Sequence, residues 1–291
     1  MSSLSADSAG AQEAAPLVVV APGASTYPGP WARVRSYFRR PRTPLWLEAV
    51  FIAWLCWLYD DINSLSPLRV GAAFANAHRI LRFEHFLHLD PEAGLDHWLD
   101  GHQTLGWLAG NYYDNVHFIV TLGLVGIVWW RFPEKYRPLR NSLVLTNLIA
   151  MVIFWLLPTA PPRLVAPSVY PDIVGLSHSF GSWHHGTLAT AANQLAAFPS
   201  LHIGWAAWAA LAAWRILPRR RWRYLVWLYP TLTAFAVMAT GNHYLTDVVA
   251  GAVVFIVAQL VSDRWGAWWT SREARRALHQ AGRMSVVGSA D

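Results

Sequence analysis

The chain has 291 residues, of which 54% are hydrophobic and 14% are charged. Soluble globular domains carry about 25% charged residues, so this composition excludes an ordinary soluble domain and predicts a membrane protein. The net charge is +6, but the arginines lie in short clusters between apolar runs, which argues against nucleic-acid binding and for charges that set membrane orientation. The single cysteine, Cys56, excludes a disulfide within one chain and a metal site built from cysteines.

The first 30 residues are rich in Ala, Ser, Gly and Pro and contain almost no large apolar side chains. Such a segment cannot bury enough surface to offset its ordering entropy, so we expect a disordered cytoplasmic tail over 1–30. No signal peptide is expected, because this stretch has no basic start and its apolar run 17–21 is too short for a signal core. A membrane-embedded domain is expected over 31–262, followed by a basic cytoplasmic tail over 263–291.

Six apolar runs approach the length of about 20 helical residues that crosses a hydrocarbon core of about 30 Å. They are 45–59, 113–130, 139–157, 200–217, 222–240 and 243–261. Between the first two runs, residues 63–110 interleave apolar and charged side chains, which is typical of helices that lie in the headgroup layer. The sequence therefore predicts an all-α membrane bundle of six transmembrane helices with interfacial amphipathic helices.

Basic residues are distributed unequally over the connections between these runs. Five arginines precede the first run, and the connections 131–140 and 215–223 and the C-terminal tail carry four, five and five basic residues. The opposite connections carry fewer, since 158–199 contains only Arg163 and 60–112 has three arginines against seven acids. By the positive-inside rule, both termini are predicted to be cytoplasmic.

The stretch Gly-Asn-His-Tyr-Leu-Thr-Asp at 241–247 opens the last predicted span on its outer side. If the helix begins at 241–242, His243 and Asp247 lie on one face, so the carboxylate can fix the tautomer of the imidazole and stabilise its cation. An isolated pair of this kind is more often an ordinary hydrogen-bonded pair. Its meaning therefore depends on which other polar groups lie near it.

The stretch Phe-Pro-Ser-Leu-His at 198–202 opens the fourth predicted span, also on the outer side. A helix that begins at Pro199 and Ser200 would place unpaired N–H groups and its positive dipole end beside His202, where an anion can bind. Both histidine motifs and the Pro-rich stretch ending at Arg163 fall at one membrane level. Small residues in the two spans would let the helices pack closely, so the two histidines are expected to approach each other.

These motifs resemble those of the type 2 phosphatidic acid phosphatase superfamily, membrane-embedded lipid phosphatases and phosphotransferases of six spans. Residues 199–202 are similar to the family's Pro-Ser-Gly-His motif, with Leu201 in place of the commoner glycine, and 243–247 are similar to its His-x-x-x-Asp motif. With the stretch Pro-Thr-Ala-Pro-Pro-Arg at 158–163, they look more like the inositol phosphorylceramide synthase branch, the inositolphosphotransferases. The resemblance covers about residues 110–262.

The phosphate site has fewer cations than the family pattern. Leu156 lies seven residues before Arg163, where the family has Lys or Arg, and Ala236 and Val237 replace the usual Ser-Arg upstream of the last histidine. Arg163 is then the obvious remaining cation. A site with fewer cations suits a phosphodiester with one negative charge better than a phosphomonoester with nearly two, which favours transfer of a substituted phosphate.

The resemblance implies a phosphohistidine mechanism that needs no cofactor and no metal. His243 would attack phosphorus, Asp247 would orient it, and His202 would protonate the leaving alkoxide and later deprotonate the acceptor hydroxyl. Arg163, Ser200 and the backbone N–H groups that open the same helix would stabilise the phosphate oxygens.

Two further sets of polar residues indicate a function less clearly than the motifs do. Four residues at the outer end of the second span are expected either to contact a polar head group or to bond neighbouring helices, namely Asn111, Tyr112, Asp114 and His117. Three histidines of the 158–199 loop have no acid or cysteine clustered with them, so they are not expected to bind zinc, namely His178, His184 and His185.

The expected function is an integral-membrane phosphotransferase that moves phosphate or inositol phosphate from a lipid to a hydroxyl acceptor. One alternative is a phosphatase that hydrolyses phosphatidic acid-like or polyprenyl phosphates with water; a proton-coupled transporter and a non-catalytic lipid-binding protein are the others. The transporter requires polar residues through the depth of the bilayer, whereas here they gather at one end of the spans. The expected location is the cell membrane, with the active site on the outer face.

Overall fold

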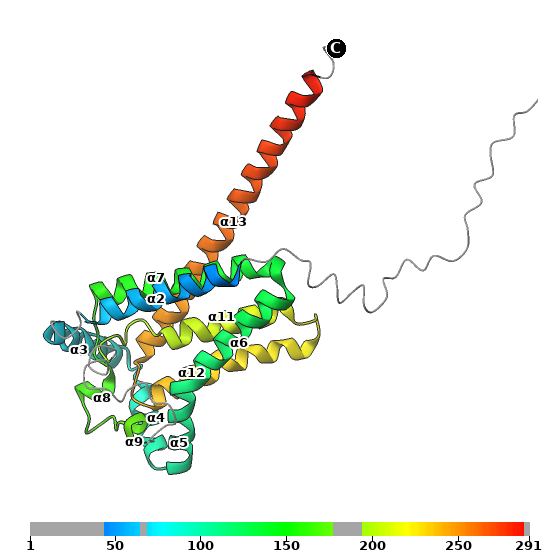
Figure 1. Ribbon diagram of the computed structural model, residues 1–291. Coiled ribbons are helices and arrows are strands. Elements are labelled where there is room, and N and C mark those ends of the chain that lie inside the picture. The colour runs from blue at the N-terminus through cyan, green and yellow to red at the C-terminus, as the bar shows by residue number, and fades with distance from the viewer. Residues whose placement is uncertain (1–43, 65–68, 177–193, 288–291) are drawn as a thin grey trace, which may run out of the picture. The chain divides into compact units, whose positions relative to one another are not determined.

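The computed structural model describes three stretches of the chain, 44–64, 69–176 and 194–287. They belong to the compact unit Pro41–Asp291. Helices dominate these stretches, which contain no β-strand, and one isolated β-type pairing joins Thr159 to Ala196 (Figure 1). The all-α prediction is therefore confirmed. The predicted tail 1–30 and the loop histidines lie outside the described residues.

A helix occupies each of the six predicted spans, and three more occupy the predicted interfacial segment. In chain order the helices are α2 (Leu45–Ser64), α3 (Val70–Leu87), α4 (Pro91–Asp100), α5 (Gln103–Asn111), the π-helix η2 (Tyr112–Val116), α6 (His117–Arg131), α7 (Pro133–Leu156), the short α8 (Pro162–Val165) and α9 (Ile173–Leu176), α11 (Leu201–Ile216), the 3-10 helix η3 (Arg221–Trp227), α12 (Leu228–Ala239) and α13 (Leu245–Val287).

Two of the described helices are long and apolar enough to cross a membrane, α7 over Pro133–Leu156 and α13 over Leu245–Trp269. The helices α6, α11 and α12 have only 15, 16 and 12 residues. The helices α6 and α12 are short because the residues directly before them form the π-helix η2 and the 3-10 helix η3. The two long helices support a membrane protein, while the count of six spans stays a prediction.

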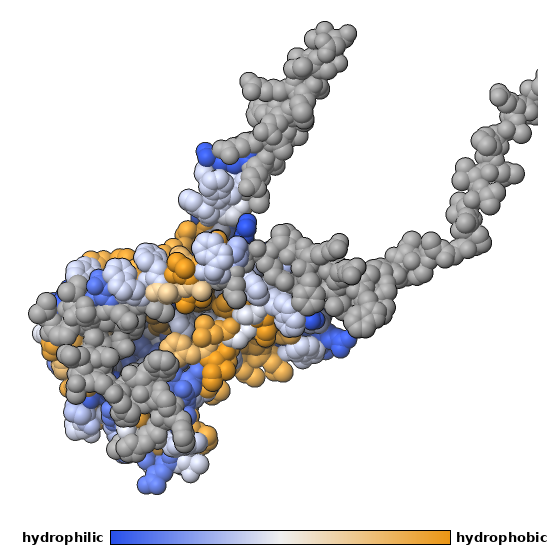
Figure 2. Space-filling view, in the orientation of Figure 1, coloured by the Kyte–Doolittle hydropathy of each residue, from blue (hydrophilic) through white to orange (hydrophobic). Residues whose placement is uncertain are grey.

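The outward faces of these helices are apolar. Figure 2 shows hydrophobic residues gathered on the surface where α6, α7 and α12 lie. The exposed residues of these helices and of α13 include Ile119, Leu122, Val152, Leu156, Leu228, Leu232, Val249 and Val253. A contiguous exposed apolar surface of this kind is expected where a protein meets lipid and not water.

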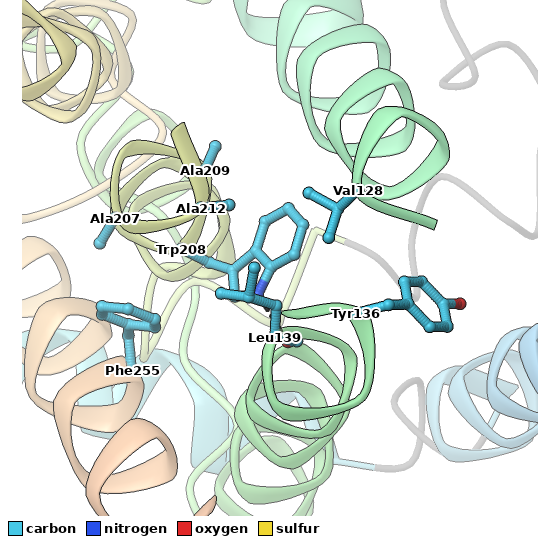
Figure 3. Packing of buried hydrophobic residues seen from close by; sticks show 8 residues of the cluster. All are labelled: Val128, Tyr136, Leu139, Ala207, Trp208, Ala209, Ala212 and Phe255. Atoms are coloured by element: carbon cyan, nitrogen blue, oxygen red, sulfur yellow. Dashed lines mark hydrogen bonds between the residues drawn. The ribbon is translucent and has the colours of Figure 1, made fainter. Parts of the chain in front are cut away.

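The core is built around α11, which packs against α6, α7, α12 and α13. Alanines line much of α11, and they let the neighbouring helices approach closely. Trp208 fills the space that remains, and its indole N–H donates to the Leu139 carbonyl at 2.8 Å. Trp208 belongs to a buried cluster that also contains Val128 of α6, Leu139 of α7 and Phe255 of α13, so four helices contribute to this part of the core (Figure 3).

Gly251 marks the closest approach of α13 to the start of α11. A Cβ at this position would lie 2.2 Å from the Ser200 carbonyl oxygen, and the Ser200 N–H donates to the Asp247 carbonyl at 3.0 Å. Backbone atoms therefore form both sides of this contact. This contact limits the distance between the start of α11 and the start of α13, which carry the two histidine motifs.

We expect Gly251→Ala to lower the free energy of unfolding by about 1–3 kcal/mol, because the added methyl group meets backbone that cannot move aside. Gly126→Ala on α6 is the matched control, since a Cβ there has nothing within 4 Å. Thermal unfolding in detergent should show a lower midpoint for the Gly251 variant and an unchanged or higher one for Gly126→Ala. Equal midpoints would mean that the two helices can separate freely.

Candidate functional site

The structure corrects the predicted start of the last helix. α13 begins at Leu245, so His243 precedes the helix instead of lying in its first turn. Gly241 has a φ of 64°, the left-handed region that favours glycine, and lies in the turn between α12 and α13. The later start follows from Asp247, whose carboxylate accepts the backbone N–H of Tyr244 at 3.0 Å and so caps the helix there.

His243 is buried, and its Nδ1 lies between two oxygen acceptors. The Ala197 carbonyl oxygen is 2.9 Å away, and Asp247 Oδ2 is 3.3 Å away. Because a carbonyl oxygen can only accept a hydrogen bond, Nδ1 must carry the proton, which leaves the lone pair of the neutral ring on Nε2. The pairing of His243 with Asp247 is present as the motif predicted. The closer partner of Nδ1 is the backbone carbonyl of Ala197, a contact that cannot be predicted from residue types.

His202 lies in the first turn of α11, and its ring centroid is 5.6 Å from that of His243. Tyr113 stacks on the His202 ring with centroids 4.3 Å apart, and the His117 ring meets it at 4.4 Å in an edge-on arrangement. Tyr113 belongs to the π-helix η2, and His117 directly follows it. Single π-helical turns occur frequently at functional sites, and here the turn places two rings against His202.

Arg163 is fixed to the turn that carries His243. Its backbone N–H donates to the Gly241 carbonyl at 3.0 Å, and its Nε donates to Asn242 Oδ1 at 2.8 Å. The amide of Asn242 is held in turn by the carbonyl and hydroxyl of Thr240, both at 3.0 Å. Nη1 lies 3.8 Å from Asp172 Oδ2. The guanidinium is therefore oriented by the residue next to His243.

Short backbone bonds join the three predicted motifs. The Thr159 N–H donates to the Leu195 carbonyl at 2.8 Å, and the Ala197 N–H donates to the Thr159 carbonyl at 3.1 Å. Because the Ala197 carbonyl also accepts from His243, the Pro-rich stretch, the segment before α11 and the turn before α13 form one unit. The structure thus brings five predicted site residues together, Arg163, Ser200, His202, His243 and Asp247.

The start of α11 offers groups that can bind an anion. Ser200 precedes the helix in an extended conformation and makes no side-chain cap bond. Its side chain is fully buried, and its Oγ has no hydrogen-bond partner within the part of the chain that the structure describes. The first N–H groups of a helix have no intrahelical partner, so this hydroxyl and these donors suit phosphate oxygens.

The four predicted head-group residues have different surroundings. Asn111 donates to a carbonyl of its own helix, and the Tyr112 hydroxyl is 2.7 Å from a threonine hydroxyl of α12. Tyr112 therefore bonds a neighbouring helix, the second of the two expectations. Asp114 is buried, and only His117 has its ring against His202. Of the four, His117 is the residue that the structure brings directly to the candidate site.

Three buried acids of the segment 63–110 were missed by sequence reasoning, which treated this segment as an interfacial surface. Glu84 of α3 and Glu92 and Asp96 of α4 are at most 2% exposed. Burial raises the pKa of Asp96 to about 8, and the charges of two neighbouring aspartates add to the shift. Glu92 and Asp96 are four residues apart and so lie on one face of α4, but only the packing of that face shows that it is buried.

No group of three or more His, Cys, Asp or Glu suited to a metal ion occurs among the residues that the structure describes. His178, His184 and His185 lie outside those residues. The arrangement around His243 instead offers a nucleophilic ring nitrogen, a second histidine, a buried carboxylate and an oriented guanidinium. These are the groups that a metal-independent phosphoryl transfer requires.

A family model matches residues 78–261, which include both histidine motifs and Arg163. The chain belongs to the PAP2 superfamily. This confirms the resemblance at the level of the superfamily and makes the protein a lipid-phosphatase-type enzyme. A crystal structure of LpxE from Aquifex aeolicus is similar over 60% of this chain and 92% of that chain, with 16% sequence identity and a TM-score of 0.41. A comparison with curated proteins finds no match.

Proposed function

We propose that this PAP2-superfamily protein is an integral-membrane phosphotransferase that moves phosphate or inositol phosphate from a lipid to a hydroxyl acceptor through a phosphohistidine on His243. One observation carries the proposal. The Nδ1 proton of His243 is held by the Ala197 carbonyl and Asp247, which leaves Nε2 as the nucleophile. The centroid of the His202 ring is 5.6 Å from that of His243, and Arg163 binds Asn242, the residue before His243, so an acid–base group and a cation are both near the nucleophile.

In the first half-reaction, Nε2 of His243 attacks phosphorus, and the bond to the lipid oxygen breaks. His202 donates its proton to the leaving alkoxide, while Asp247 stabilises the charge that develops on the His243 ring. In the second half, His202 removes the proton from the acceptor hydroxyl, whose oxygen attacks phosphorus. The P–N bond breaks, and His243 returns to its neutral form. No metal or cofactor enters either step.

The charge of the site supports a substituted phosphate as the transferred group. Among the three motif segments 158–163, 198–202 and 241–247, Arg163 is the sole arginine or lysine. One guanidinium with the N–H groups of α11 matches the single charge of a phosphodiester better than the nearly double charge of a phosphomonoester. This supports an inositolphosphotransferase-like reaction over hydrolysis of a phosphatidic acid-like lipid.

A phosphatase is the second candidate, because water can replace the acceptor alcohol in the same second step. Purified protein should be incubated with phosphatidylinositol or phosphatidic acid, with and without ceramide as acceptor. We expect inositol phosphorylceramide and diacylglycerol when phosphatidylinositol and ceramide are both present, and neither product with His243→Ala. Inorganic phosphate from phosphatidic acid as the only product would establish the phosphatase, and absence of turnover with every lipid would favour a binding or transport protein.

We further propose that both termini are cytoplasmic and that the site faces the outside of the cell membrane. The arginine pattern supports this orientation. A cluster of tryptophans lies at the end of the apolar part of α13, where Trp268 packs edge-on against Trp269 and the Arg272 guanidinium lies 3.9 Å from the Trp268 ring centroid. Tryptophan rings and arginines together are typical of a membrane–water interface.

This orientation predicts opposite labelling of two exposed positions. In a Cys56→Ser background, a cysteine replacing Ser168 should react with an impermeant thiol reagent added to intact cells. A cysteine replacing Arg220 should react only after the membrane is opened. Labelling of both positions from the same side would contradict the proposed topology.

A further inference from the structure

The start of α13 is capped by a side chain from a distant helix. Glu84, near the end of α3, accepts the backbone N–H of Thr246 at 2.6 Å, across a sequence separation of 162 residues. Thr246 lies in the first turn of α13, where backbone N–H groups lack intrahelical partners. A negative charge at this end also interacts favourably with the helix dipole. Glu84 is 2% exposed, so the bond is shielded from water.

A second buried carboxyl group lies beside Glu84. Glu92 of α4 is fully buried, and its carboxyl group interacts with that of Glu84. Neither Glu92 oxygen has a hydrogen-bond donor among the described residues. Burial and, to a lesser degree, the carboxyl group and charge of Glu84 raise the pKa of Glu92 to about 9. Two carboxylates in contact cannot both stay ionised in a buried site, so at neutral pH Glu92 holds the proton and donates it to Glu84. The other titratable groups near the pair are Asp90, Asp96, Tyr170, Tyr244 and Asp247.

The capped turn also holds the candidate nucleophile. Thr246 directly precedes Asp247, whose carboxylate binds Nδ1 of His243 and the N–H of Tyr244. The Asp247 carbonyl accepts the N–H of Ser200 at the start of α11. A shift of this turn would therefore move the carboxylate away from His243. It would also separate the two histidine motifs.

We propose that Glu84 and Glu92 are positioning residues that share one proton and hold the first turn of α13, so that Asp247 keeps His243 in its reactive orientation. This inference rests on the proposed function, because it concerns the histidine that would carry the phosphate. Neither glutamate touches the substrate. Both act through the backbone of Thr246.

The pH profile separates this role from a merely structural one. Turnover of the wild-type protein should fall as pH rises through about 9, because Glu92 then loses the shared proton and repels Glu84. In Glu92→Gln the amide N–H₂ donates to Glu84 at every pH. We expect this variant to keep turnover within about threefold of wild type at pH 7 and to lose the alkaline decline.

Variants of Glu84 test the cap itself. Glu84→Ala should lose about 100-fold in turnover, since a small displacement of catalytic groups has costs of this order. Glu84→Gln should recover most of the loss, because its amide oxygen still accepts the Thr246 N–H. Asp100→Asn is the control, an exposed acid of the same helix α4 whose charge does not act on Glu92, and it should keep both the turnover and the alkaline decline of wild type.

Hydrogen–deuterium exchange gives a readout that does not depend on turnover. The Thr246 amide should exchange faster in Glu84→Ala than in wild type, and at pH 9.5 faster in wild type than in Glu92→Gln. This pattern in a protein without turnover on any lipid would overturn the proposed function and leave the positioning role intact. Unchanged exchange and turnover in Glu84→Ala, or a wild-type alkaline decline in Glu92→Gln, would overturn the positioning role.

Discussion

A covalent phosphohistidine is expected to accumulate on the His202→Ala variant and to be absent from His243→Ala. The assay uses a labelled lipid donor that carries a good leaving group, so that the first step does not require protonation. The His202 variant keeps the attacking Nε2 of His243 but cannot deprotonate the acceptor, and the reaction stops at the intermediate. The bound label should be acid-labile and base-stable, as a phosphorus–nitrogen bond is.

Turnover rates cannot assign these roles by themselves. Removing either member of a cooperating catalytic pair typically costs several orders of magnitude, so both variants should be nearly inactive. Trapping separates them because the two histidines act in different steps. The structural basis is the Nδ1 proton of His243, which two oxygen acceptors hold in place.

His102→Ala serves as the matched histidine control. His102 is exposed, its Nδ1 is 2.7 Å from the carbonyl of Trp98 in the preceding turn, and it has no contact with the candidate site. This variant should turn over like wild type. Label on His243→Ala would reverse the assignment of nucleophile and acid–base group. Wild-type rates in both site variants would mean that neither histidine carries the reaction.

The apolar runs predicted where the helices lie because a span of hydrophobic residues has few other stable arrangements. The charge asymmetry between connections also predicted that the histidine motifs and Arg163 would lie at one level, and the structure brings them together. The lengths of α6 and α12 were not predictable. The π-helix η2 and the 3-10 helix η3 shorten them, and the apolar pattern along the sequence does not distinguish these helix types from an α-helix.

The backbone contact of His243 and the burial of the acids could not be predicted from the sequence, for two different reasons. The Ala197 carbonyl, which is the closest partner of His243, exists at every residue and leaves no signal in residue type. Glu84 and Glu92 carry charges on helices with exposed apolar residues, which is also the pattern of a headgroup-facing surface. They are buried because α3 packs against α13 and α4 packs against α12, and residue type alone does not show this packing.

Arg163→Ala is expected to lose about 10²- to 10³-fold in turnover, the range seen when one donor to a developing oxyanion is removed. The fold should persist, because the bond from the Arg163 backbone N–H to the Gly241 carbonyl does not need the side chain. Arg79→Ala on α3 removes an exposed arginine predicted to lie on the same side of the membrane, and should keep wild-type turnover.

Arg163→Lys distinguishes charge from geometry. Lysine keeps the positive charge but has no planar fork, so it cannot bind Asn242 with one nitrogen while others face the phosphate. We therefore expect turnover between that of Arg163→Ala and wild type, with the deficit in kcat because the oriented donors act in the transition state. Full recovery by lysine would mean that only charge is needed. Activity of Arg163→Ala within a fewfold of wild type would make the arginine an interfacial anchor, and the N–H groups of α11 would then be the main phosphate donors.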